Sequence, residues 1–150
     1  MKHHFRTRTS IEAPIEDVFA FFSAAGNLER ITPPSLRFQI LTPLPIKMEE
    51  DVLIEYKLRI NGIPARWRTR IPVWNPPYEF VDEQLSGPYK SWVHTHRFRE
   101  EDGRTIMDDH VEYSLPFFPF GLVAYPFVRA QVEAIFAHRA HAIRERFSGE

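Results

Sequence analysis

The C-terminal part of the chain carries one long apolar stripe, which predicts a helix over about residues 123–147. Residues three and four positions apart share one face of a helix. The members of this face are Val128, Val132, Ile135, Phe136, Arg139, Ile143 and Phe147. Pro126 falls in the first predicted turn, where proline is tolerated. Because so long a face must pack on a large apolar surface, the preceding residues are expected to form an antiparallel sheet.

Alternating apolar and polar residues predict that sheet. The expected strands cover residues 5–12, 36–41, 52–60, 65–73, 80–85, 92–99 and 106–113. Asn61-Gly62 and Asp102-Gly103 favour two-residue hairpin turns, and two short helices are expected between residues 14 and 31. The predicted fold class is therefore α+β. It is a curved antiparallel sheet of about seven strands wrapped around the long C-terminal helix, with two short helices after the first strand.

Composition limits the classes of function. The chain has 150 residues, the ordinary size of one domain, and we expect a single domain over residues 1–150. The absence of cysteine excludes disulfides and thiolate metal sites. A formal net charge of −1 gives no electrostatic reason to expect a nucleic-acid partner. No apolar run could span a bilayer and the N-terminus lacks a signal-peptide core, so we expect a cytoplasmic protein without stable membrane insertion.

Two histidines fall on the buried face of the strand over residues 92–99. Side chains alternate between the faces of a strand, so Trp92, His94, His96 and Phe98 share one face. The hairpin about Asp102-Gly103 makes the next strand a neighbour and places Asp109 close to His96. Buried imidazoles need hydrogen-bond partners. The set is therefore a closed internal network, a patch that orients a ligand, or an acid–base pair, and the sequence leaves all three open.

A metal is a further interpretation of the same three residues. Two histidines on one strand face and a carboxylate are an acceptable ligand set for zinc or non-haem iron. The motif His-x-His is a weak signal by itself. We therefore expect no metal and no cofactor.

Aromatic side chains dominate the predicted inner surface of the sheet. These side chains are Tyr56, Trp67, Trp92, Phe98 and Tyr113. They either line a pocket or fill the core. On the strand over residues 65–73, Ala65, Trp67, Thr69, Ile71 and Val73 are expected to point inward, and Arg66, Arg68 and Arg70 outward towards Glu55. The apolar loop over residues 116–121, with Phe117, Phe118 and Phe120, is expected to fold over the core, to gate a cavity, to touch a membrane or to form a homodimer contact.

The order of the elements and two sets of residues resemble the helix-grip proteins of the SRPBCC superfamily, which includes START lipid-transfer domains, polyketide cyclases and birch-pollen-type allergens. The first set is Ile11-Glu12-Ala13-Pro14 followed by Val18-Phe19-Ala20-Phe21. The second set is Gly87-Pro88-Tyr89 with Trp92, His94, His96, Phe98, Asp109, Val111, Tyr113 and Pro116. The second set is similar to a bacterial subfamily that is sometimes described as cyclase/dehydrase.

The resemblance implies a deep cavity between the sheet and the long helix, holding an apolar or amphipathic small molecule. It implies no particular reaction, because carriers, sensors and enzymes share the scaffold. Ring-hydroxylating members hold iron with two histidines and an aspartate, but at another spacing and on other elements, so that ligand set does not transfer to His94, His96 and Asp109.

We therefore expect the protein to bind a small hydrophobic or amphipathic molecule in such a cavity. The residues expected to line it are Tyr56, Trp67, Trp92, His94, His96, Asp109, Tyr113 and Phe136. One alternative is a cofactor-free cyclase, dehydratase or aromatase acting on a polyketide-like substrate, in which His94, His96 and Asp109 are the candidate catalytic residues. A second alternative is a protein interaction module that uses the loop over residues 116–121.

Overall fold

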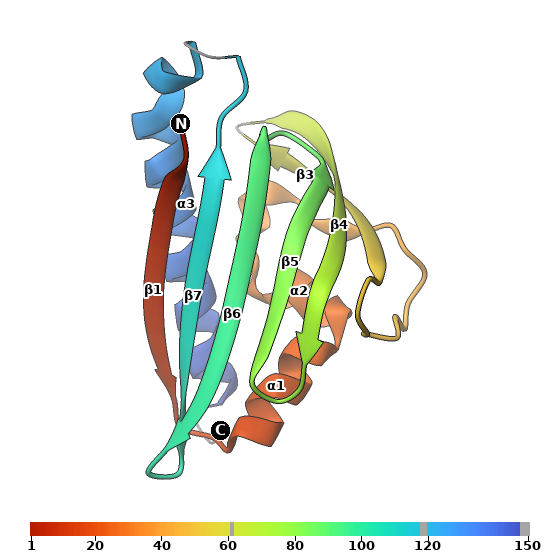
Figure 1. The fold of residues 1–150 in the computed structure, drawn as a ribbon, viewed down its shortest axis with the longest axis vertical. Coiled ribbons are helices and arrows are strands. Elements are labelled where there is room, and N and C mark those ends of the chain that lie inside the picture. Colours follow the sequence, from red (N-terminus) through yellow and green to blue (C-terminus); the bar gives the residue numbers. More distant parts are fainter. Residues whose placement is uncertain (61, 118–119, 148–150) are drawn as a thin grey trace.

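The computed structural model describes residues 1–60, 62–117 and 120–147, and in these ranges seven antiparallel strands form one sheet that curves around a long helix (Figure 1). The strands are β1 (His3–Ile11), β2 (Gln39–Ile40), β3 (Leu53–Ile60), β4 (Ile63–Asn75), β5 (Glu79–Ser86), β6 (Ser91–Glu101) and β7 (Arg104–Ser114). Their spatial order is β1-β7-β6-β5-β4-β3-β2. Thus β2 to β7 form a meander, and β1 pairs with the last strand. The predicted fold class is confirmed.

The helices lie on one face of the sheet (Figure 1). They are α1 (Ile15–Ser23), η1 (Ala25–Asn27), α2 (Leu28–Ile31), η2 (Pro34–Leu36) and α3 (Phe120–Arg146). Pro14 caps α1, and Glu16 and Asp17 occupy its first turn, where acidic side chains favour the positive end of the helix dipole. The side chain of Asn27 donates a hydrogen bond to the carbonyl of Phe21 at 2.8 Å and so helps to end this helix.

The core lies between the helices and the sheet. Phe19 of α1, Phe98 of β6 and Met107 of β7 belong to one buried cluster, which also includes Ile143 of α3. A second cluster joins Val111 and Tyr113 of β7 to Val132 and Phe136 of α3. The apolar stripe of the C-terminal helix therefore packs on the sheet, as its spacing predicts.

Both hairpin predictions agree with the strand register. Ile60 pairs with Ile63, and Glu101 pairs with Arg104, so each connection has two residues. Asp102 and Gly103 both have positive φ, 54° and 79°, as a type I′ turn requires. Asn61, which opens the other turn, lies outside the described residues.

The ends of two elements differ from the expectation. The last helix begins at Phe120 instead of near residue 123, so Pro126 lies inside the helix and not in its first turn. The helix tolerates this proline because packing of its apolar face, more than the local backbone hydrogen bonds, stabilises it. The strand expected over residues 36–41 is only the short β2, because η2 and a left-handed Arg37 (φ 47°) precede it.

A bulge in β4 reverses one predicted alternation. Between Arg70 and Val73, β4 advances three residues where its partner β5 advances two. Pro72 lies in this step, and a proline cannot donate a hydrogen bond to the sheet. Beyond the extra residue, side chains that would have faced inward face outward, and the reverse. Val73, expected to point inward, is therefore 37% exposed, and the ring of Trp74 packs on Phe19 with centroids 5.1 Å apart.

The N-terminal strand contacts the last helix through His3. His3 is buried in β1 although it is the third residue of the chain. Its ring stacks on Tyr125 of α3, with centroids 3.8 Å apart. Within the described residues, no helix has the length and apolarity needed to cross a membrane.

Candidate ligand-binding site

A cavity of about 160 Å³ lies between the sheet, the short helices and α3. Apolar and aromatic side chains make up most of its wall, among them Phe22, Leu28, Leu36, Phe38, Met48, Ile54, Leu58, Ile71, Phe80, Val132 and Ile135. Its polar or ionisable members include Thr32, Tyr56, Thr69, Asp82, His94, His96, Gln131 and Arg139. An apolar pocket with a few convergent polar groups is the usual form of a small-molecule site.

Six of the eight residues expected to line a cavity do line it. They are Tyr56, Trp67, Trp92, His94, His96 and Phe136. Asp109 does not, because it is buried beneath the two imidazoles and is only 3% exposed. Tyr113 does not either. It points inward, but its ring packs among His3, Tyr89 and Trp92.

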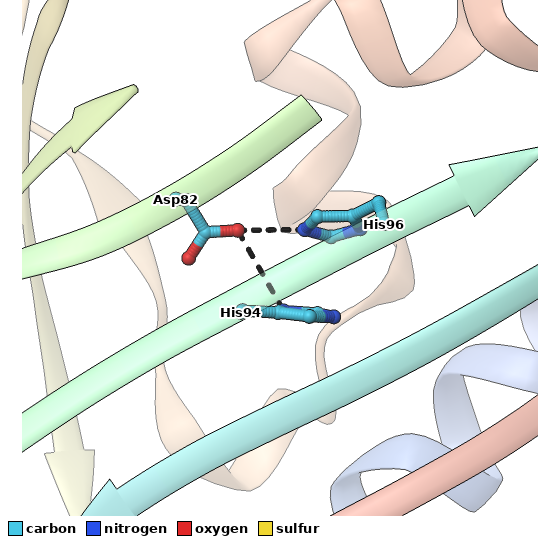
Figure 2. Close-up of side chains that lie close together, drawn as sticks. All are labelled: Asp82, His94 and His96. Atoms are coloured by element: carbon cyan, nitrogen blue, oxygen red, sulfur yellow. Dashed lines mark hydrogen bonds and ion pairs between the residues drawn. The ribbon is translucent and has the colours of Figure 1, made fainter. Parts of the chain in front are cut away.

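Four side chains on three adjacent strands form a polar cluster, which we define as Asp82, His94, His96 and Asp109. His94 Nε2 donates a hydrogen bond to Asp109 Oδ1 at 2.7 Å, and His96 Nε2 donates one to Asp82 Oδ2 at 2.6 Å. His94 Nδ1 lies 3.6 Å from the same Asp82 oxygen. Figure 2 shows the carboxylate of Asp82 facing both imidazoles.

Strand register brings the polar cluster together. His96 lies opposite Asp109 on β7, as the hairpin predicts, and His94 lies opposite Asp82 on β5. Because β6 runs between β5 and β7, each neighbouring strand contributes one carboxylate to the histidine pair. His96 Nδ1 is 3.3 Å from Asp109 Oδ1, yet the direction of its N–H does not meet hydrogen-bond geometry, so this contact is electrostatic.

Three rings stack at the polar cluster, and a fourth ring contacts the stack edge-on. Phe80 and His96 have centroids 3.9 Å apart, and His96 and His94 have centroids 3.6 Å apart. Phe136 of α3 closes the stack edge-on to His94 at 5.2 Å. The stack fixes the planes of both imidazoles, so the positions of their nitrogens are set by packing as well as by hydrogen bonds.

The two histidines have opposite charge preferences. Burial and the neighbouring His96 lower the pKa of His94 to about 4. Burial alone would also lower the pKa of His96, but the hydrogen bond to Asp82 and the charges of Asp82 and Asp109 raise it. Burial works against ionisation of both carboxyls as well, and contacts with the histidines lower their pKa values below the ordinary range. The polar cluster therefore favours a neutral His94 and a positive charge on His96, which lies between two carboxylates.

Apart from His96 Nδ1, which lies beside Asp109, two buried donors of the cavity wall have no hydrogen-bond partner within the described part of the chain. They are the indole Nε1 of Trp67 and the guanidinium Nε of Arg139. The Arg139 guanidinium lies 5.6 Å from the ring centroids of both Phe22 and Phe136, so it is held by aromatic contacts in the cavity. Buried donors are nearly always paired in native proteins. These two donors are therefore unpaired polar groups on residues of the cavity wall.

Tyr56 links two strands at the cavity wall. Its hydroxyl lies 3.0 Å from Thr69 Oγ1, and its ring is stacked on Trp67 with centroids 5.8 Å apart. Burial raises the pKa of Tyr56, so the phenol keeps its proton at neutral pH.

Sequence reasoning missed three cavity residues that matter for its chemistry. Asp82 lies on a strand whose pattern shows no clear inner face. Tyr89 stands out in the sequence only within Gly87-Pro88-Tyr89, as part of the family resemblance, and not as a cavity residue. Arg139 gave a usable signal, because it falls on the apolar stripe of the last helix, where a charged side chain must either point into a cavity or pair with a buried partner.

A second hollow of about 310 Å³ adjoins the cavity and shares Ile60, Tyr89 and Gln131 with its wall. Phe117, which is 81% exposed, also lines this hollow. The hollow thus lies beside the cavity, near the start of α3. The rest of the predicted aromatic loop, at residues 118–119, lies outside the described residues.

The chain matches a known protein family over nearly its whole length. Residues 2–148 match the family described as polyketide cyclase/dehydrase and lipid transport, and the chain belongs to it. This membership confirms the predicted SRPBCC relationship. No curated protein sequence matches the chain.

Solved structures share the fold at low sequence identity. The Zhui aromatase/cyclase from Streptomyces sp. R1128 superimposes with a TM-score of 0.77 at 16% identity, covering 99% of this chain and 94% of that one. A START superfamily protein from Mycobacterium smegmatis gives 0.71 at 13%, covering 97% of each chain. A ginseng major latex-like protein from Panax ginseng gives 0.67 at 10%, covering 97% of each. These likenesses establish the helix-grip fold, and family membership supports ligand binding or cyclisation in general.

Proposed function

We propose that the protein binds a small amphipathic molecule in the cavity between the sheet and α3, as a carrier or sensor. The observation that carries this proposal is an apolar cavity whose wall contains the unpaired buried donors of Trp67 and Arg139. An apolar body would bury its surface against the aromatic wall. Acceptor oxygens on the same molecule would pair the two donors, and the positive charge of Arg139 favours an anionic group such as a carboxylate.

The size of the cavity limits what fits without movement. A cavity of about 150 Å³ accommodates one benzene molecule in an engineered protein. The cavity described here is about 160 Å³, and an adjoining hollow of about 310 Å³ shares part of its wall. A molecule with one ring in the cavity and an extension along the hollow therefore suits the shape.

Native mass spectrometry of protein purified from its own host tests the proposal directly, with organic extraction of the same sample. We expect a bound organic mass that carries an oxygen acceptor. Binding of 1-anilinonaphthalene-8-sulfonate then tests the location. Ile54→Trp fills the cavity, whereas Leu53→Trp, on the exposed face of the same strand, leaves it open. The dye fluorescence should disappear in the first variant and persist in the second. Equal fluorescence in both, with an empty extract, overturns the proposal.

A cofactor-free dehydratase or cyclase is a second candidate, supported by the opposite charge preferences of His94 and His96 beside the cavity. In a dehydration, His94 would accept a proton from the carbon next to a substrate carbonyl. His96 would donate a proton to the departing hydroxyl, so that a carbon–carbon double bond forms and water leaves. Incubation with a β-hydroxy thioester tests this role. No water loss above that of the double variant His94→Gln/His96→Gln would exclude it.

A further inference from the structure

We propose that Asp82, His94 and His96 form a binding site for a first-row divalent transition metal, such as Zn²⁺ or Fe²⁺, at the wall of the cavity. One nitrogen from each histidine and one oxygen of Asp82 lie within 4.8 Å of one another. Two histidines and one carboxylate are a ligand set that such metals accept. The metal would lie at the wall of the proposed ligand cavity. The site rests on the proposed function in one respect only, that an oxygen of the bound organic molecule completes the coordination.

The distances from Asp82 to the two histidine nitrogens suit a metal, and the stacked imidazoles must tilt apart so that both nitrogens point at it. Ligand atoms of a tetrahedral zinc site lie about 3.3 Å apart, given bonds of about 2.0–2.1 Å. Asp82 Oδ2 is 2.6 Å from His96 Nε2 and 3.6 Å from His94 Nδ1, so the two separations bracket that value. A cation between these atoms would replace the proton that now bridges Asp82 and His96.

Asp109 already occupies the position of an outer carboxylate. It accepts the hydrogen bond of His94 Nε2, which leaves a lone pair on His94 Nδ1, the nitrogen nearer Asp82. Its Oδ1 also lies 3.3 Å from His96 Nδ1, the nitrogen that would not bind the metal. A carboxylate behind metal-binding histidines fixes the tautomer and orientation of their rings.

The charges around the site and its open coordination positions favour an anionic fourth ligand. Two carboxylates offset the charge of a divalent metal, and Arg139 adds one positive charge to the same cavity. The three ligand residues all line the cavity, so the remaining coordination positions face it. A carboxylate or carbonyl oxygen of the organic molecule would fill one of them.

Cobalt titration of the purified full-length chain tests the metal site without any organic ligand. Chelator-treated protein should bind one Co²⁺ and give visible ligand-field bands, and Zn²⁺ should displace it. Asp82→Ala should abolish the bands. Asp109→Asn should weaken binding about 10- to 100-fold, as expected for the loss of an outer carboxylate.

An exposed histidine pair supplies the matched control. His4 Nδ1 lies 2.9 Å from His110 Nε2 on the surface of β1 and β7, where metal would bind adventitiously. His110→Ala should leave the cobalt bands unchanged. The proposal is overturned if the wild-type chain gives no bands, or if the bands survive Asp82→Ala. If Asp82→Ala does not fold by circular dichroism, His94→Gln decides in the same way. An organic occupant found in a chain that binds no cobalt would support the proposed function and refute only the metal.

Discussion

The imidazoles of His94 and His96 lie face to face with ring centroids 3.6 Å apart and an angle of 27° between their planes. Two protonated imidazoles at this separation would repel each other strongly. Asp82 and Asp109 flank the pair and favour one positive charge in it. The polar cluster is therefore both a packed part of the sheet and a source of donors and acceptors at the cavity wall.

Asp109→Asn should destabilise the fold far more than the adjacent Asp108→Asn. Asp109 is buried and accepts a hydrogen bond from His94, so replacing its carboxylate by an amide weakens that bond and buries an N–H group without an acceptor, at a cost of about 1–3 kcal/mol. Asp108 points to the opposite face and pairs with Arg8 in solvent, a contact worth about 0–1 kcal/mol. Urea unfolding measures both free energies. Equal losses would mean that Asp109 carries little of the stability.

Sequence patterns predict three of the four members of the polar cluster. Alternation from Trp92 places both imidazoles on the inner face, and the two-residue turn at Asp102-Gly103 sets His96 opposite Asp109. Such local rules do not reach Asp82, since its place depends on how β5 aligns with β6 across a longer connection. The strand itself, with polar residues at 82, 83 and 84, has no alternation that marks an inner face.

Tryptophan fluorescence should report occupation of the cavity. Trp67 and Trp92 line it, whereas Trp74 packs on Phe19 away from it. Binding of a non-absorbing ligand, such as decanoate or the molecule recovered from the host, should change the emission of the first two. Trp74→Phe should keep the ligand-induced change, and Trp67→Phe/Trp92→Phe should lose most of it. A change that disappears only with Trp74→Phe would place the ligand elsewhere.

The buried ring of His3 should make stability depend on pH. Burial, the α-amino group and His4 lower the pKa of His3 in the folded chain. In the unfolded chain the pKa returns to about 6.5, so the unfolded state binds more protons below that value. The contribution of His3 is therefore fully present above about pH 6.5 and is lost as the pH falls. Relative to His3→Phe, the wild type should lose stability between about pH 7 and pH 5 in thermal unfolding. A difference that stays constant over this range contradicts the assignment.

The cavity residues that the sequence missed differ in why they were missed. Arg139 lies on the helix stripe between Phe136 and Ile143, so its inward direction follows from spacing alone. What spacing does not give is the absence of a partner for its Nε, which depends on the shape of the whole cavity. The bulge in β4 also escapes prediction from the sequence, because a single extra residue reverses the face of every later side chain without altering the composition of the strand.

Paired substitutions at the bulge test that reversal. Trp74→Ala should lower the free energy of unfolding by roughly 2–4 kcal/mol, because the half-buried indole contacts Phe19 and Phe80 in the core. Val73→Ala should change it by less than about 0.5 kcal/mol, since Val73 faces outward past the bulge. Simple alternation from Ile71 predicts the opposite ranking. Denaturant unfolding of the two variants therefore decides between them, and a larger loss at Val73 would mean that the strand continues without the extra residue.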